Sequence, residues 1–320
     1  MEENKTRKAS DCPYEHHRQF KSSLRKAASD WFSKHSYDTQ AKMPYCLEKR
    51  EDWHNNIICS KVAEYIDKEK KRHIDNNVTF PLHKYLHHGL SSQAMTFNLL
   101  GPLFCGNDLQ PLRQALENIG VEWPAGKLEY KFEHCARDVF KESPGQPTSF
   151  DAAIVGDNSG IFIEVKLAEQ AFGGCSVFSN GDCEGRNPYP DKLEDCHLHL
   201  LGRTYWERMR ENELAASNLV SGAICPFTNY YQFFREVLYA VVNNGVFILL
   251  HDERNPTFFK MRDREERGLW PFLVESIPQS LRPKIGRLTI QSLVQAIEQT
   301  KRHRCWIPEF KEKYGMTQFK

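Results

Sequence analysis

The sequence predicts an α/β fold with a mixed central sheet, and the order of its local patterns carries this prediction. Three short apolar segments between residues 128 and 167 are separated by turn-forming residues, which is typical of strands. A helical pattern at 91–100 precedes them, and a second helical pattern at 230–243 and a fourth apolar segment at 246–250 follow. The expected order is therefore helix, three strands, helix, strand (αβββαβ).

Capping residues and prolines delimit the first helices of this core. Ser91 or Ser92 can cap a helix, because a serine side chain accepts a hydrogen bond from an unpaired N–H of the first turn. We expect this helix to end where Gly101 and Pro102 follow each other. Pro111 then opens a second helix with its apolar residues along one stripe.

The three strands are bounded by clear turn signals. Residues 128–134 alternate between aromatic and charged side chains, and residues 150–155 and 161–167 are strongly apolar. The segment Gly-Asp-Asn-Ser-Gly at 156–160 joins the last two strands. Its residues tolerate the positive φ angles of tight turns, so we expect an antiparallel hairpin.

Composition limits the class of protein. The 320 residues include 43 Lys and Arg against 42 Asp and Glu, which gives a net charge of +1, and the mean hydropathy is -0.61. Near-neutrality excludes a uniformly basic protein that coats nucleic acid, but it is compatible with a local basic cleft. A polar start and ten cysteines lead us to expect a cytoplasmic protein with reduced thiols and no membrane span.

The pattern divides the chain into three parts. Residues 1–88 are rich in charge, and we expect them to form a helical N-terminal extension. Residues 89–270 hold the α/β core, which a loop-rich stretch at 169–228 interrupts. Residues 271–320 are expected to form a C-terminal helical segment, in which Thr289 caps a helix.

Acidic and basic side chains gather on the predicted hairpin. Asp151 lies at the start of one strand, and Glu164 and Lys166 share one face of its partner because strand side chains alternate. Two carboxylates can hold Mg²⁺, which polarises a phosphate and lowers the pKa of a bound water, while an ammonium can orient that water. This set suits phosphodiester hydrolysis, and a solvated strand face is the alternative interpretation.

Four segments resemble the PD-(D/E)xK nuclease superfamily, in its restriction-endonuclease-like branch, over about half of the chain. They are SSQAMTFNLLGPL at 91–103, Phe-Glu at 132–133, TSFDAAIV…GIFIEVKL at 148–167 and YYQFFREVLYA at 230–240. Phe150 stands where the motif has its proline, a position without a chemical role. The resemblance implies a restriction-endonuclease-like core and a metal-dependent nuclease that acts on DNA, with RNA as the alternative.

The same resemblance implies roles for individual residues. Asp151 and Glu164 would bind Mg²⁺ or Mn²⁺ together with the backbone carbonyl of Val165. Lys166 would orient the attacking water or stabilise negative charge, and Glu133 would bind a second metal directly or through water.

Two residues of the predicted 230–243 helix complete this expected site. Gln232 matches a polar position that faces the site in such nucleases, and Arg235, three residues further on the same helix face, could contact a phosphate. A homodimer would suit a double-strand cutter, because two-fold DNA sites match two-fold proteins.

The loop-rich stretch at 169–228 carries four cysteines, which are Cys175, Cys183, Cys196 and Cys225. Zinc or an iron–sulfur cluster could bind there, and some nucleases of the superfamily carry such a cluster. No CxxC pair occurs, however, and such pairs are the strongest sequence signal for a metal, so free thiols are the favoured interpretation.

Candidate DNA-phosphate contacts are the basic residues that follow the fourth strand, namely Lys260, Arg262, Arg264 and Arg267. A solvated helix end is the alternative for this group. Two other functions also stay open: a catalytically silent nucleic-acid-binding protein of the same fold, and an interaction scaffold stapled by a Cys/His metal site.

Overall fold

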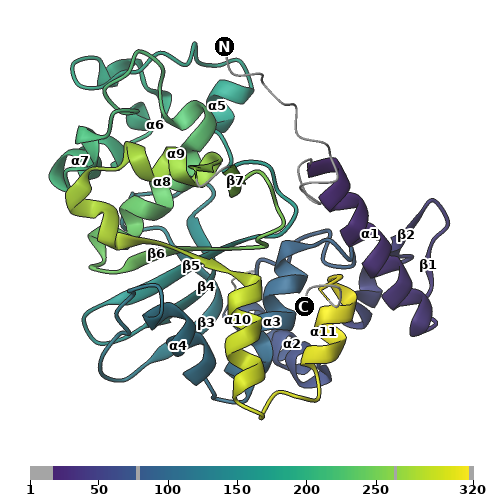
Figure 1. Cartoon of the computed structure of the whole chain (residues 1–320). Coiled ribbons are helices and arrows are strands. Elements are labelled where there is room, and N and C mark those ends of the chain that lie inside the picture. Colours follow the sequence, from purple (N-terminus) through teal and green to yellow (C-terminus); the bar gives the residue numbers. More distant parts are fainter. Residues whose placement is uncertain (1–16, 77–79, 263–264, 317–320) are drawn as a thin grey trace, which may run out of the picture.

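The computed structural model describes residues 17–76, 80–262 and 265–316. Its centre is a mixed five-stranded sheet in the order β3-β4-β5-β6-β9 (Figure 1). These strands are β3 (Glu129–Ala136), β4 (Thr148–Val155), β5 (Gly160–Lys166), β6 (Val246–His251) and β9 (Ile285–Thr289). The first three are antiparallel neighbours, and β6 and β9 continue the sheet in parallel, which confirms the predicted α/β class with a mixed sheet.

Helices cover both faces of this sheet (Figure 1). One face is covered by α3 (Ser92–Cys105), α4 (Gln110–Glu117) and α10 (Ile290–Gln299). The other is covered by α7 (Tyr205–Glu211), α8 (Phe227–Val242) and α9 (Leu269–Ser276). Alternate residues of β5 enter the two cores: Ile163 packs with the α3 side and Phe162 with the α8 side. Strand β5 is therefore buried on both faces.

The described part of the N-terminal segment contains two long helices and also short strands, which the sequence did not predict. Its elements are α1 (His17–Lys34), β1 (Thr39–Gln40), β2 (Met43–Leu47), the 3-10 helix η2 (Arg50–Asn56) and α2 (Ser60–Asp75). Strand β2 buries Leu47 against Trp31 and Phe32 of α1. That contact joins residues far apart in sequence, so local spacing does not reveal it. Residues 1–16 and 77–79 of the predicted extension lie outside the described residues.

Helix α3 begins as predicted but continues beyond its expected end. The Ser91 hydroxyl accepts a hydrogen bond from the Ala94 N–H, 3.2 Å away, as a cap should. The helix then runs through Gly101 and Pro102 to Cys105. A Cβ at Gly101 would lie 2.5 Å from Val62, so glycine lets α2 pack closely here. Burial of almost the whole helix outweighs the local cost of proline, about 3 kcal/mol.

The C-terminal segment supplies a strand that the sequence did not predict. Strand β9 pairs with β6, and its apolar Ile285 and Leu288 are separated by Gly286 and Arg287, which hides the alternation. As predicted, Thr289 caps α10: its hydroxyl accepts from the Ser292 N–H at 3.1 Å. Helix α11 (Ile307–Lys313) then packs against α1 near the C-terminal end.

Two connections carry only short elements. Between β5 and α7 lie α5 (Ser176–Ser179), η3 (Leu193–Asp195) and α6 (His197–Leu200), and η4 (Leu214–Ala216) follows α7. After β6 come β7 (Lys260–Arg262), β8 (Glu265–Arg267) and, beyond α9, η5 (Gln279–Lys284). Among the helices that the structure describes, none has the length and apolar character needed to cross a bilayer.

The buried histidine at the end of β6 makes stability depend on pH. His251 is fully buried, and burial together with Arg287 lowers its pKa from 6.5 to about 4, against an opposing effect of Asp252. The unfolded chain therefore binds a proton below pH 6.5 that the folded chain does not. We expect the free energy of unfolding to fall as the pH drops from 6.5 to 4, with about 3 kcal/mol due to His251.

Urea unfolding at a series of pH values between 7 and 4 measures this effect. The variant His251→Gln should show a shallower loss of stability toward acid, whereas His83→Gln, at an exposed histidine, should follow the wild type. Equal slopes for His251→Gln and the wild type would contradict the assignment.

Candidate active site

Three carboxylates lie in a row across three neighbouring strands. In the register of β3 and β4, the pairs Phe132–Ala152 and His134–Phe150 flank Glu133 and Asp151. The register of β4 and β5 ends at Ala152–Ile163, next to Asp151 and Glu164. The Asp151 carboxylate accepts a hydrogen bond from the backbone N–H of Val165 at 2.7 Å, which fixes its position between the strands. The row therefore brings together residues that the sequence separates by up to 31 positions.

Glu164 and Lys166 form a buried ion pair beneath α8. Their exposed fractions are 6% and 7%, and the Lys166 ammonium lies 2.7 Å from Glu164 Oε1. The two side chains lie on one face of β5, as predicted. Because α8 covers that face, the alternative of a solvated strand face is wrong.

Gln232 connects this ion pair to α8. Its amide Nε2 donates to Glu164 Oε1 at 2.6 Å and to Glu236 Oε1 at 2.9 Å, while its Oε1 accepts from the Lys166 ammonium at 2.9 Å. The helix departs from helical angles at Tyr230, and the Gln232 N–H donates to the Gly173 carbonyl at 3.0 Å. Gln232 thus faces the predicted site, and the loop after β5 holds it there.

Two residues of the site were missed by sequence reasoning. Gln93 donates from α3 to Glu133 Oε1 at 2.6 Å, and Glu236 lies fully buried one helical turn after Gln232. Both are polar residues inside strongly apolar helices, and that is the signal that could have found them. Glu133 itself has φ of 51°, a left-handed conformation that costs about 1–2 kcal/mol in a non-glycine residue and tends to occur at functional sites.

Burial and mutual repulsion dominate the electrostatics of the carboxyl groups. Burial, partly opposed by the Gln93 hydrogen bond and reinforced by Glu164, raises the pKa of Glu133 to about 8. Burial, with Glu164 and Glu133 nearby, raises the pKa of Asp151 well above its usual range. A cation among these groups would relieve both the desolvation and the repulsion.

Lys166 keeps its charge in this setting. Burial alone would lower its pKa, but Glu164, Glu169 and Glu236 outweigh that effect and raise it. Burial and Glu164 also raise the pKa of Glu236 well above the usual range of a carboxyl group. The Lys166 ammonium and the Glu236 carboxyl group are both bonded to Gln232.

Arg235 belongs to a neighbouring cluster. Its guanidinium lies 3.7 Å from the Glu142 carboxylate and 4.8 Å from the centre of the Tyr231 ring. The Tyr205 hydroxyl donates to the same carboxylate at 2.6 Å. Arg235 therefore links α8 to Glu142, which also contacts Tyr205 of α7, and the phosphate contact stays a prediction.

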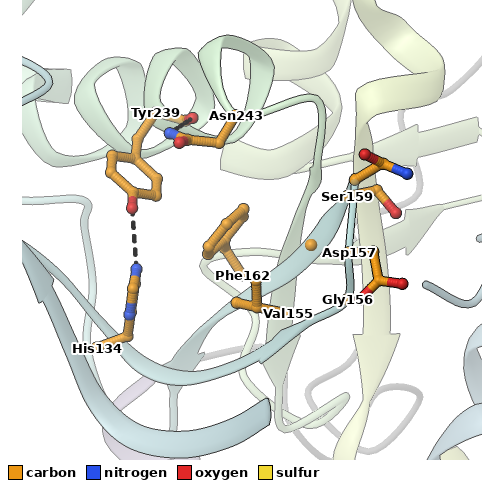
Figure 2. Close-up of a pocket in the computed structure, with 10 residues that line it drawn as sticks. His134, Val155, Gly156, Asp157, Ser159, Phe162, Tyr239 and Asn243 are labelled. Atoms are coloured by element: carbon orange, nitrogen blue, oxygen red, sulfur yellow. Dashed lines mark hydrogen bonds between the residues drawn. The ribbon is translucent and has the colours of Figure 1, made fainter. Parts of the chain in front are cut away.

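A cavity of about 270 Å³ lies at the turn end of the β4–β5 hairpin on the α8 side, and none of the three carboxylates of the row lines it (Figure 2). It is lined by His134, Phe162, Tyr239, Asn243 and the hairpin turn at 156–159. His134 follows Glu133 directly, and its ring lies 2.9 Å from the Tyr239 hydroxyl. Burial and Lys131 lower the pKa of His134 to about 4, so the ring is neutral near pH 7. Three separate elements build this cavity, so no local sequence pattern indicates it.

The four cysteines of the loop-rich stretch come together around a second, smaller cavity. Cys175, Cys183, Cys196 and Cys225 all line it, and its volume is about 20 Å³. None of the four thiols forms a disulfide. Among the predicted basic residues, Lys260 and Arg262 lie on β7 and Arg267 ends β8, whereas Arg264 lies outside the described residues.

Comparison with known proteins agrees with this geometry. A family model described as Restriction Endonuclease associating with ARP matches residues 25–315, which include every residue of the carboxylate row. Searches of curated proteins and of solved structures find no match. The family match confirms the resemblance to restriction endonucleases that the motifs indicated. The chain belongs to the family described as Restriction Endonuclease associating with ARP.

Proposed function

We propose that the protein hydrolyses phosphodiester bonds in DNA with the help of a divalent cation. One observation carries the proposal: a buried Lys166–Glu164 ion pair lies directly beside Asp151 on the central hairpin. Membership of a restriction endonuclease family supports DNA as the substrate. We further propose that α3, β3–β5, α8 and β6 form the αβββαβ core of a PD-(D/E)xK nuclease.

The donor atoms suit a hard cation such as Mg²⁺ or Mn²⁺. Asp151 and Glu164 offer carboxylate oxygens, and Val165, whose backbone carbonyl would be a third ligand, directly follows Glu164 on β5. Among the described residues, no three His, Cys, Asp or Glu side chains form a ready-made metal site. Mg²⁺ commonly uses one or two carboxylates and keeps several waters, so this smaller donor set is sufficient. The bound ion would polarise the phosphate and lower the pKa of a water.

The chain's own groups have distinct tasks in this proposal. Lys166 presents a charged ammonium that orients the attacking water or stabilises charge on a phosphate oxygen. Gln232 holds Lys166 and Glu164 in register by bonding to both. Glu133, held by Gln93, stands at the other end of the row and would bind a second ion directly or through water.

DNA contacts are proposed for the basic residues on β7, β8 and their connection, which are Lys260, Arg262, Arg264 and Arg267. The family description also names an association with ARP, so we propose that the nuclease works beside a partner. If the protein bound DNA in a salt-sensitive way but did not cleave it with any divalent ion, it would instead be the catalytically silent alternative.

Replacing Asp151 should separate activity from stability. We expect Asp151→Asn to reduce Mg²⁺-dependent nicking of plasmid DNA at least about 100-fold, because the variant loses a metal-binding carboxylate. Without added metal, the same variant should unfold at a higher temperature than the wild type, because it removes one of three repelling carboxylates. Gel-based nicking assays and thermal unfolding measure the two effects.

The exposed residue Glu129 on β3 provides a matched control for this prediction. Glu129→Gln removes the same kind of charge outside the row and should keep wild-type nicking. If Asp151→Asn nicked DNA at the wild-type rate, the site assignment would be wrong.

Gln232 and Glu236 should act by positioning the ion pair. Gln232→Ala should reduce the nicking rate by about 10- to 100-fold, the range seen when supports of metal ligands are lost. Glu236→Gln should nick within a few-fold of the wild type, because burial raises the pKa of this carboxyl group and glutamine, its neutral counterpart, keeps the hydrogen bond from Gln232. The control is Asn229→Ala, which removes an exposed side-chain amide from the same helix and should keep wild-type nicking. A severe loss in Glu236→Gln would contradict a neutral positioning role.

A further inference from the structure

The four thiols that line the smaller cavity, hereafter the cysteine cluster, come from four separate segments. The cluster consists of Cys175, Cys183, Cys196 and Cys225. Cys175 and Cys225 are each only 8% exposed. Most other side chains that line the cavity are apolar, such as Val177, Leu198 and Phe227. Sulfur atoms are therefore the main metal-binding donors around a space that is about as large as one water molecule.

Two thiols of the cluster already accept hydrogen bonds at sulfur. The backbone N–H of Gly185 lies 3.3 Å from Cys183 Sγ, and the indole N–H of Trp206 lies 3.4 Å from Cys196 Sγ. Gly185 has φ of 71°, so the turn after Cys183 needs a residue that tolerates a left-handed conformation. Donors aimed at sulfur stabilise thiolates, which are the form that binds metal.

The cluster joins the two ends of the long insertion between β5 and α8. The Cys175 N–H donates to the Phe227 carbonyl at 2.8 Å, and the Cys225 N–H donates to the Gly185 carbonyl at 2.9 Å. A Cβ at Gly174 would lie 2.2 Å from the Thr228 carbonyl oxygen, so only glycine allows this approach. The cysteines therefore converge where the insertion leaves and re-enters the core.

The part of the insertion before α7 has little regular secondary structure. Its helices before α7 span only three or four residues each, and all four cysteines are free of disulfides. Cross-linking by metal is how short, irregular loops of reduced proteins commonly gain order. Among the described residues, no group of three or more His, Cys, Asp or Glu side chains is already arranged to hold a metal ion, so the proposed site forms only when an ion binds.

We propose that the cysteine cluster binds one structural Zn²⁺ in a tetrahedral four-thiolate site. Four cysteine ligands fill the four coordination positions of a tetrahedral Zn²⁺ and leave none for water. This ligand set is typical of structural zinc sites. The ion holds residues 173–174 against the start of α8, where the Gly173 carbonyl accepts from the Gln232 N–H. Zinc at the cysteine cluster lies outside the carboxylate row. It thereby supports the position of Gln232, whose side-chain amide bonds to Lys166 and Glu164.

Elemental analysis of full-length protein purified without chelators tests the proposal. We expect about one zinc ion per chain. The variants Cys183→Ser and Cys225→Ser should lower the zinc content at least about tenfold. Cys105→Ser and Cys305→Ser, at exposed cysteines outside the cluster, should keep it. Asp151→Asn should also keep its zinc, so a failure of the nuclease proposal is distinguishable from a failure of this one.

A second measurement avoids variants that fail to fold. Removing zinc from the wild type with a strong chelator should lower its unfolding temperature and expose additional thiols to a thiol reagent, and added Zn²⁺ should reverse both. The proposal is overturned if the purified protein lacks zinc, if it contains iron and acid-labile sulfide instead, or if the cluster variants retain zinc. Unchanged thiol reactivity after chelation would overturn it as well.

Discussion

The burial of Lys166 beside Glu164 is the constraint on which the rest of the site depends. Removing two charges from water costs several kcal/mol for each ion, so the pair persists only with good geometry and further hydrogen bonds. Gln232 supplies those bonds from α8, and the Gly173 carbonyl holds Gln232 in turn. One polar network therefore connects β5, α8 and the insertion at 169–228 inside an otherwise apolar core.

That network is unbalanced in charge, and the imbalance is informative. Glu133, Asp151, Glu164 and Glu236 surround a single ammonium, and burial raises the pKa of three of the four carboxyl groups. A core selected only for stability would not keep such a group of acids, because well-packed apolar residues of similar volume are often more stable. Crowded carboxylates make chemical sense where a cation and a phosphate enter. Stability and activity are therefore expected to oppose each other at Asp151.

The long insertion at 169–228 is more than a connection between β5 and α8. It begins next to the groups that contact Gln232, brings four cysteines around one cavity, and returns to the core at Cys225. The order of this insertion and the order of the site are consequently linked. The overall charge of +1 is compatible with this arrangement, since only four of the 42 acidic residues lie in the site.

The sequence by itself determined the α/β class, the central hairpin and the residues Asp151, Glu164 and Lys166, because these depend on local periodicity and turn chemistry. Only the tertiary structure decided which side chains meet across elements. It brought Gln93 and Glu236 to the site, directed Arg235 to Glu142, and added β9 to the sheet. It also carried α3 through Gly101 and Pro102, because packing against α2 outweighs a local helix-breaking signal. Contacts between distant segments leave no local pattern, so their outcome is fixed by burial and packing.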